Sequence, residues 1–230
     1  MESKTFQLVT ATKLGDSAYE QISAALMAGR LKPGERVTIR TLAESLGISS
    51  TPVRDAVMRL IQNKALEQKT LRDVRVPVLN EARFREIISI RIELEGMAAA
   101  KAATRITDAQ IEILENLIEE NERAIREEEW DRASACNQRF HFSIVDAADL
   151  PVLRDMLEAL WLQTGPLVAG YYKRGGRTMI EEHYNIVLAL KARDGKMTAK
   201  AMRKDVSGSI DGISAYIGEL RDAGDSHDQD

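Results

Sequence analysis

The sequence predicts a mainly α-helical protein, with an N-terminal winged helix-turn-helix followed by an all-α helical bundle. Two observations predict this fold class. Two short amphipathic helices joined by a glycine turn occupy residues 38–61, and strand patterns follow them. From residue 80 onward, apolar residues recur at helical spacing without strand alternation. We expect a flexible arm, a winged domain, a helical domain and a disordered tail at residues 1–15, 16–78, 79–221 and 222–230.

Residues 38–61, TIRTLAESLGISSTPVRDAVMRLI, carry the signals of two helices joined by a tight turn. Thr38 can cap the first helix, and Gly47 suits the left-handed position that ends it because it has no Cβ. Ser49 or Ser50 can cap the second helix. The side chains that remain outward at its start are Ser50, Thr51 and Arg54. They suit phosphates and base edges, which indicates a DNA-recognition helix; an ordinary packed helix pair is the alternative.

Two short strand patterns at residues 65–69 and 74–78 flank a turn and predict a wing. The basic side chains placed there to meet the backbone of a duplex are Lys69, Arg72 and Arg75. Solvated charges on an edge hairpin are the alternative for each of them.

Charge is distributed unevenly along the chain. Residues 1–75 contain 12 Lys or Arg against 8 Asp or Glu, and the remainder contains 20 against 28, which together give the net charge of −4. A basic N-terminal region followed by an acidic remainder is typical of a nucleic-acid-binding protein. No run approaches the ~18 apolar residues of a membrane span, and there is no signal-peptide pattern. With a single cysteine and hence no internal disulfide, we expect a cytoplasmic protein without a membrane partner.

Residues 17–78 resemble the winged helix-turn-helix of the GntR superfamily of bacterial transcription regulators. The resemblance rests on GRLKPGE at 29–35, LAESLGIS at 42–49 and TPVRDAV at 51–57, in order and with intact spacing. It implies binding to double-stranded operator DNA through Arg40 and the start of the recognition helix. Ser50 stands where the family usually has Arg, which removes a guanine-reading side chain, and Lys64 and Leu71 stand in stretches that usually have Gly. The predicted DNA-binding residues are Arg40, Ser49, Ser50, Thr51, Arg54, Lys69 and Arg72.

We expect a homodimer on a short palindrome, because one helix-turn-helix contacts too few bases for useful specificity. The helical domain is the expected dimer interface. Its helices are expected at 81–104, from 108 onward, 130–147, 151–163 with a continuation towards 172, 178–192 and 197–220. The segment 171–177 is expected to join two of these helices, as a solvated loop or as a cover for a pocket mouth.

Residues 80–220 resemble the FCD effector domain of the FadR/VanR branch of the same superfamily. The resemblance rests on RIELE at 91–95, Phe140-His141, Glu182-His183 and LAL at 188–190. It implies a small organic acid as effector and a divalent metal such as Zn, Ni or Mn. The positions that match the family's four metal ligands are Asn137, His141, His183 and Asp205, of which the two histidines agree with the family. Because Asn in place of Asp removes a charge, we expect a weak or empty site.

The chemistry of these residues also allows a metal site. Asn137 and His141 are four positions apart and project from one helical face. His183 lies among apolar residues, so it is expected to point inward. Two imidazoles and the Asp205 carboxylate form a legitimate ligand set for a first-row metal. Hydrogen-bonded core histidines are the alternative.

Arg91 is a candidate for binding the effector, together with His141 and His183. It lies in a segment rich in Ile, so its guanidinium must find an anion or reach water. One interpretation is an intrahelical pair with Glu95, four residues later. The other, favoured by the resemblance, is a fork for an effector carboxylate.

A metal-dependent enzyme that uses the His/Asp cluster is the main alternative function. The sequence contains no G-x-S-x-G, P-loop or H-E-x-x-H motif, and Cys136 is expected to be a small core residue. RNA binding is disfavoured because no aromatic stacking platform accompanies the basic residues. We therefore predict a transcription regulator, not an enzyme, whose operator affinity is controlled by a small-molecule effector.

Overall fold

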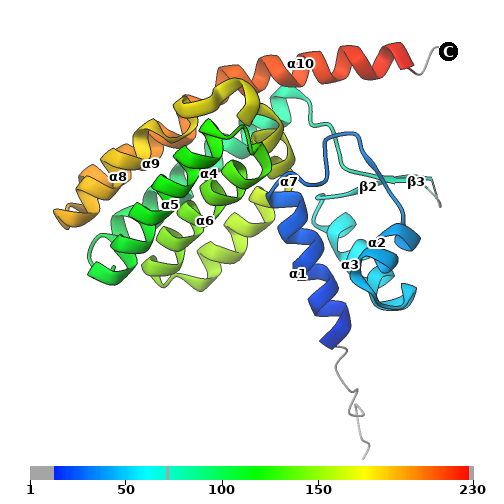
Figure 1. Ribbon diagram of the computed structural model, residues 1–230, viewed down its shortest axis with the longest axis horizontal. Helices are drawn as coiled ribbons and strands as arrows, with labels where there is room; N and C mark the ends of the chain where they lie inside the picture. Colours follow the sequence, from blue (N-terminus) through cyan, green and yellow to red (C-terminus); the bar gives the residue numbers. More distant parts are fainter. Residues whose placement is uncertain (1–12, 71–72, 228–230) are drawn as a thin grey trace, which may run out of the picture.

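The computed structural model describes residues 13–70 and 73–227, which form a small winged domain and a larger helical domain (Figure 1). The winged domain contains α1 (Lys13–Met27), β1 (Arg36–Val37), α2 (Ile39–Leu46), α3 (Ser50–Gln62), β2 (Glu67–Thr70) and β3 (Asp73–Arg75). Its sheet is antiparallel in the order β1-β3-β2, with Val37 opposite Val74. The apolar stripe of α3 packs towards α1, and Val53, Ala56 and Leu60 are fully buried.

The winged domain differs from the expected one in its boundaries. The first helix begins at Lys13, so it includes residues 13–15 of the expected arm. Strand β1 was not expected, because two residues are too short to show alternation in a sequence. It pairs with β3 and places that strand in the centre of the sheet. Residues 71 and 72 of the wing turn, and with them the candidate Arg72, lie outside the described residues.

The helical domain contains α4 (Glu81–Ala102), α5 (Asp108–Arg126), α6 (Trp130–Ala148), α7 (Pro151–Gly175), the short 3-10 helix η1 (Gly176–Ile180), α8 (Glu181–Lys191), α9 (Gly195–Gly208) and α10 (Ile210–His227). The expected cap of α5 is present: Thr107 Oγ1 accepts the N–H of Gln110, and the Gln110 side chain accepts the N–H of Thr107. Buried aromatic side chains fill the space between the helices, among them Phe84, Phe140, Trp161 and Tyr172.

Three expectations for the helical domain are corrected. Residues 171–175 continue α7 instead of forming a loop, because fully buried Tyr172 anchors this turn in the core. The segment expected as one helix over 197–220 breaks at Ser209, which lets α9 pack along α4 while α10 crosses α4 and α7. Residues 222–227, expected to be disordered, extend α10 (Figure 1). Among the described helices, none is both long enough and apolar enough to pass through a lipid bilayer.

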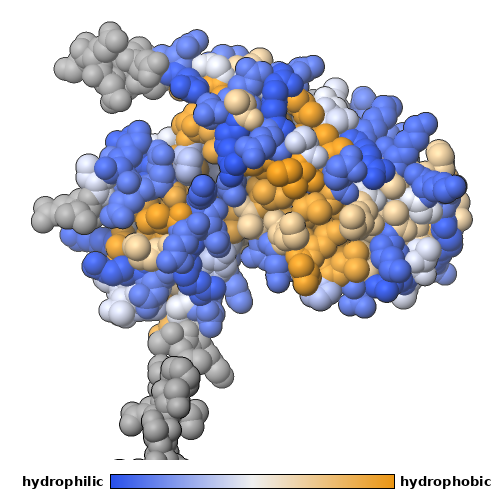
Figure 2. All heavy atoms as spheres, turned by 180° about the vertical axis from the view of Figure 1, so that it is seen from behind, coloured by the Kyte–Doolittle hydropathy of each residue, from blue (hydrophilic) through white to orange (hydrophobic). Residues whose placement is uncertain are grey.

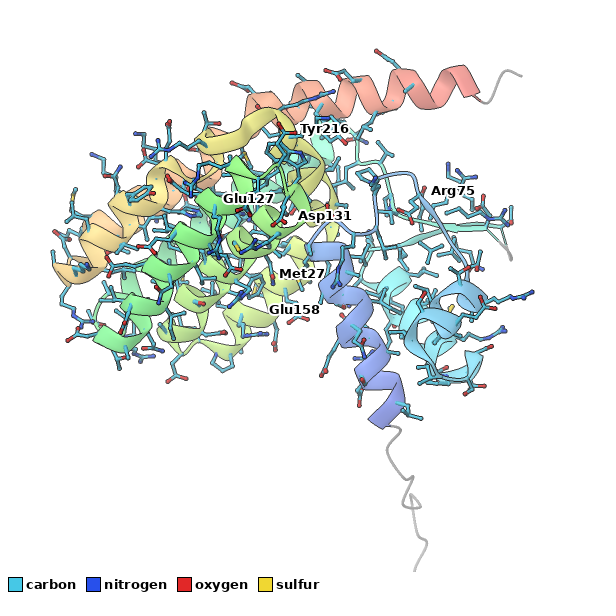
Figure 3. All side chains as sticks on the ribbon, in the orientation of Figure 1. Met27, Arg75, Glu127, Asp131, Glu158 and Tyr216 are labelled. Atoms are coloured by element: carbon cyan, nitrogen blue, oxygen red, sulfur yellow. The ribbon has the colours of Figure 1, made fainter. Side chains whose placement is uncertain are left out.

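The two domains meet where the end of α1 contacts α7. A Cβ on Gly165 would lie 2.8 Å from the Cα of Met27, so only glycine allows the two backbones to approach this closely. Gln138 of α6 adds a contact from its amide nitrogen to the Met27 sulfur at 3.8 Å. Figure 3 labels Met27 at this junction. Helix α7 therefore belongs to the helical core and also supports the winged domain.

Candidate DNA interface and buried metal and effector site

The start of α3 is exposed on the winged domain. Thr38 caps α2 by accepting the N–H of Thr41 at 3.1 Å, and Gly47 ends that helix with φ of 65°. Ser49 is the residue before α3, although its side chain makes no capping hydrogen bond. All five DNA-binding candidates in this region are exposed: Arg40, Ser49, Ser50, Thr51 and Arg54. The turn therefore orients the polar face of α3 outward while its apolar face packs inward.

Several basic residues of this domain have carboxylate partners. Arg40 donates to Glu44 at 2.9 Å, but its side chain is 88% exposed. Such an exposed pair contributes only ~0–1 kcal/mol, so a phosphate could replace the carboxylate. Lys69 lies 3.9 Å from a carboxylate oxygen of Glu67. Figure 3 labels Arg75 on the wing, where its Nε donates to both carboxylate oxygens of Asp73, two residues earlier on β3.

A buried carboxylate, Glu95, forms the centre of a polar cluster in the helical domain. Its Oε1 accepts from Arg91 Nε at 2.8 Å and from Trp161 Nε1 at 3.1 Å. The Arg91 guanidinium also donates from Nη1 to Thr164 Oγ1 at 3.0 Å and lies 3.9 Å above the Trp161 ring. Helix α4 supplies the ion pair, and α7 supplies Trp161 and Thr164. The guanidinium and the carboxylate are therefore both satisfied inside the core, as buried charges require.

The second carboxylate oxygen of Glu95 continues the cluster to two histidines. His141 Nδ1 lies 2.6 Å from Glu95 Oε2, and its Nε2 lies 3.2 Å from Asp205 Oδ2. On the other side of Asp205, Oδ1 lies 3.5 Å from His183 Nε2. The Phe140 ring stacks on His183 at 3.9 Å between centroids and fixes the plane of that imidazole. Helices α6, α8 and α9 thus contribute one of these polar groups each.

Burial and neighbouring charges set the protonation of the cluster. Burial disfavours the ionised form of Glu95, but Arg91 and His141 outweigh it and lower the pKa of this carboxyl to about 2. Burial likewise opposes charge on His141, but Glu95 and Asp205 raise its pKa to about 9. For His183, burial dominates and lowers the pKa to about 4. At neutral pH His183 is therefore an uncharged imidazole with a lone pair available.

The donor atoms of His141, His183 and Asp205 all lie within 4.8 Å of one another. His183 Nε2 is buried and has no hydrogen-bond partner, an arrangement that a metal ion would satisfy. Buried Asn137 lies one helical turn before His141 and offers a carbonyl oxygen. Two imidazoles, a carboxylate and an amide oxygen suit a divalent first-row metal. The residues present therefore fit a divalent metal ion. Asn137 supplies one negative charge fewer than an Asp at the same position would.

A cavity of about 50 Å³ adjoins this cluster, and its lining includes Arg91, Asn137, His141, Trp161 and Asp205. The structure thus brings all the sequence-derived metal and effector candidates into one region. Sequence reasoning considered Glu95 only as a partner for Arg91 and did not select Trp161 or Thr164. Both lie on α7, a helix that the sequence predicted. A periodic pattern does not show, however, that the Trp161 indole N–H contacts the Glu95 carboxylate or that the Thr164 hydroxyl contacts the Arg91 guanidinium.

The comparisons with known proteins agree with both domains. The model for bacterial regulatory proteins of the gntR family matches residues 14–76, and the FCD domain model matches residues 86–208. The HTH-type transcriptional regulator McbR of Escherichia coli (strain K12) is 35% identical over 173 residues, which cover 74% of this chain and 78% of McbR. The uncharacterized HTH-type transcriptional regulator YdhC of Bacillus subtilis (strain 168) is 32% identical over 141 residues, which cover 61% of this chain and 63% of YdhC.

A solved structure, E. coli McbR/YncC, superposes with a TM-score of 0.82 at 30% identity and covers 90% of this chain and 99% of that one. The predicted fold class is thereby confirmed. The expected function as a DNA-binding transcription regulator with an effector domain is confirmed as well. The chain belongs to the GntR family of bacterial transcription regulators and carries an FCD effector domain.

Proposed function

We propose that the protein binds operator DNA as a homodimer and that a divalent metal and a small organic acid bind at the buried cluster of the helical domain. The observation that carries the ligand site is the buried His183 Nε2 without a partner, placed beside His141 and Asp205. Because its proposed partner is operator DNA, the proposed location of the protein is the cytoplasm. The proposed DNA-contacting residues are Arg40, Ser49, Ser50, Thr51, Arg54, Lys69 and Arg72.

The proposed metal ligands are Asn137, His141, His183 and Asp205, and the metal is Zn²⁺, Ni²⁺ or Mn²⁺. When bound, such an ion supplies a positive centre that can accept an oxygen of an anionic effector. The raised pKa of His141, about 9, favours its protonated form at neutral pH, so metal binding would require the loss of a proton from Nε2, the nitrogen that faces Asp205. His183 needs no such change, because its low pKa already leaves it neutral.

Arg91 is the proposed contact for an effector carboxylate, with His141 and His183 near it. Its Nε and Nη1 already donate to Glu95 and Thr164, while the side chain also borders the cavity. An acid that enters must therefore share this guanidinium with Glu95. Because the cavity holds only about 50 Å³, we expect a small acid or an expansion of the site on binding.

The homodimer is proposed to form through the outer face of α4 and α7. Figure 2 shows a broad apolar patch on this side of the helical domain. Exposed apolar side chains on the two helices are Ile90, Met97, Val152 and Met156. On each helix they are spaced seven or four residues apart, so they share one face. A second copy of the chain would cover this patch, which a monomer would leave in water.

A metal-dependent enzyme is less well supported than a regulator. Burial raises the pKa of the Cys136 thiol to about 11, so this cysteine is protonated at neutral pH and is a poor nucleophile. The His183 ring is held by stacking on Phe140, and the His141 ring is held by Glu95 and Asp205. Imidazoles that are fixed in this way suit ligand binding better than proton transfer during catalysis. The relatives are transcription regulators.

The DNA interface is tested by replacing Arg54 with Ala. If Arg54 reads a base, operator affinity should fall by about 1–3 kcal/mol, and discrimination between sequences should weaken at one position. Fluorescence anisotropy with operator and scrambled duplexes at fixed salt measures both. Arg126→Ala removes the same charge from an exposed site on α5 and should leave affinity unchanged. Equal operator binding by Arg54→Ala and the unchanged protein would remove Arg54 from the interface.

The dimer face is tested by Met97→Glu, which introduces a charge on the part of the apolar patch that α4 contributes. We expect the variant to sediment as a monomer at concentrations where the unchanged protein is a dimer, because a buried unpaired carboxylate is costly. Ile113→Glu is the matched control, since Ile113 is 50% exposed on α5 and Met97 is 55% exposed on α4. If the Met97→Glu variant dimerises with the same dissociation constant as the unchanged protein, the dimer interface lies elsewhere.

The metal site is tested by thermal unfolding with Zn²⁺, Ni²⁺ or Mn²⁺ after removal of bound ions with a chelator. At least one ion should raise the melting temperature by mass action, and at 100 times Kd the gain in stability should be about 2.7 kcal/mol. His183→Ala should remove this response because it deletes one of two imidazole ligands. Renewed addition of chelator, which should reverse the shift, controls for nonspecific effects. If no ion stabilises the unchanged protein, the histidines are core residues only.

A further inference from the structure

We propose that Glu95 positions His141 for metal binding and links the metal site to Arg91, an inference that rests on the proposed metal site. Glu95 is not among the proposed ligands. It touches a ligand histidine through one carboxylate oxygen and the candidate effector arginine through the other. This carboxylate is fully buried on α4 and contacts both the proposed metal site, through His141, and the proposed effector site, through Arg91.

The geometry at Oε2 determines which nitrogen of His141 can hold a metal. An ionised carboxylate only accepts hydrogen bonds, so the 2.6 Å contact requires His141 Nδ1 to carry a proton. That proton leaves Nε2 as the nitrogen for the metal, and Nε2 is the atom directed at Asp205. A carboxylate on the far nitrogen of a ligand imidazole also makes the ligand more basic and fixes the ring orientation. Glu95 would perform both tasks.

The geometry at Oε1 explains why Glu95 can hold this orientation. Arg91 Nε and Trp161 Nε1 both donate to Oε1, so the carboxylate is restrained from two directions. The Arg91 guanidinium is in turn held by Thr164 on α7. An anion that draws Arg91 away from Oε1 would loosen the restraint on Glu95, and through it the orientation of His141. Occupancy of the metal site and anion binding at Arg91 should thus influence each other.

The inference is tested by the Zn²⁺ affinity of the full chain, measured by competition with a chromogenic chelator. Glu95→Gln keeps the shape of the side chain but loses its charge. We expect Zn²⁺ affinity to fall about 10- to 100-fold. Glu93→Gln is the matched control, because Glu93 lies on the same helix and its side chain is 68% exposed. It should bind Zn²⁺ like the unchanged protein.

A second readout separates positioning from a general loss of structure. In the Zn²⁺-loaded protein, long-range ¹H–¹⁵N spectra of the histidines should show one tautomer of His141, with a slowly exchanging proton on Nδ1. In Glu95→Gln this proton should exchange rapidly, while the pattern of His183 persists. If the single variant fails to fold because Arg91 is left unpaired, Arg91→Met combined with Glu95→Gln removes both buried charges and is measured instead.

Each outcome decides the inference. Weaker Zn²⁺ binding together with the altered His141 signal supports it. Unchanged affinity in the folded Glu95 variant overturns it but leaves the proposed metal site intact. If the unchanged protein does not bind Zn²⁺, the same competition is run with Ni²⁺ and Mn²⁺, and the proposed metal site and this inference both fail if none of the three ions binds.

Discussion

The organisation of the helical domain depends on one constraint, the need to surround the buried Glu95 carboxylate with donors. Arg91, Trp161 and His141 meet this need from three helices, and Asp205 extends the cluster to a further two. Removing one partner of such a buried pair typically costs about 3–5 kcal/mol, because the other charge is left without compensation. The same contacts that satisfy the buried charges therefore also fix the orientations of the side chains at the proposed ligand site.

The position of this cluster suggests how events inside the bundle reach the DNA-binding domain. Thr164 holds Arg91, and the next residue along α7 is Gly165, whose backbone touches Met27 at the end of α1. Helix α1 packs in turn on α3, the proposed recognition helix. A ligand can regulate operator binding only if its affinity differs between DNA-competent and DNA-incompetent arrangements. Movement of α7 against α1 is a direct route by which such a difference could act, because α7 contacts both the buried cluster and α1.

Much of the fold could be predicted because it depends on local signals. Thr38, Gly47 and the capping box at Thr107 mark helix ends through contacts with near neighbours. The two-residue strand β1, the break at Ser209 and the extension of α7 depend on tertiary packing, which a periodic pattern does not contain. At the site, the histidines were predicted from their residue type and resemblance. Glu95 was predicted only as a helical neighbour of Arg91, because its contacts to other helices come from distant parts of the chain.

The central claim, that a ligand at the buried cluster controls DNA binding, is tested most directly by operator affinity with and without ligand. The affinity should be measured for metal-loaded protein in the presence and absence of a panel of small carboxylic acids. For at least one acid the affinity should change roughly 5- to 150-fold, as a coupling of ~1–3 kcal/mol predicts. Arg91→Lys, which keeps the charge but loses the fork, should reduce this ratio towards one. An undiminished ratio in Arg91→Lys, or no change with any acid, would contradict the account.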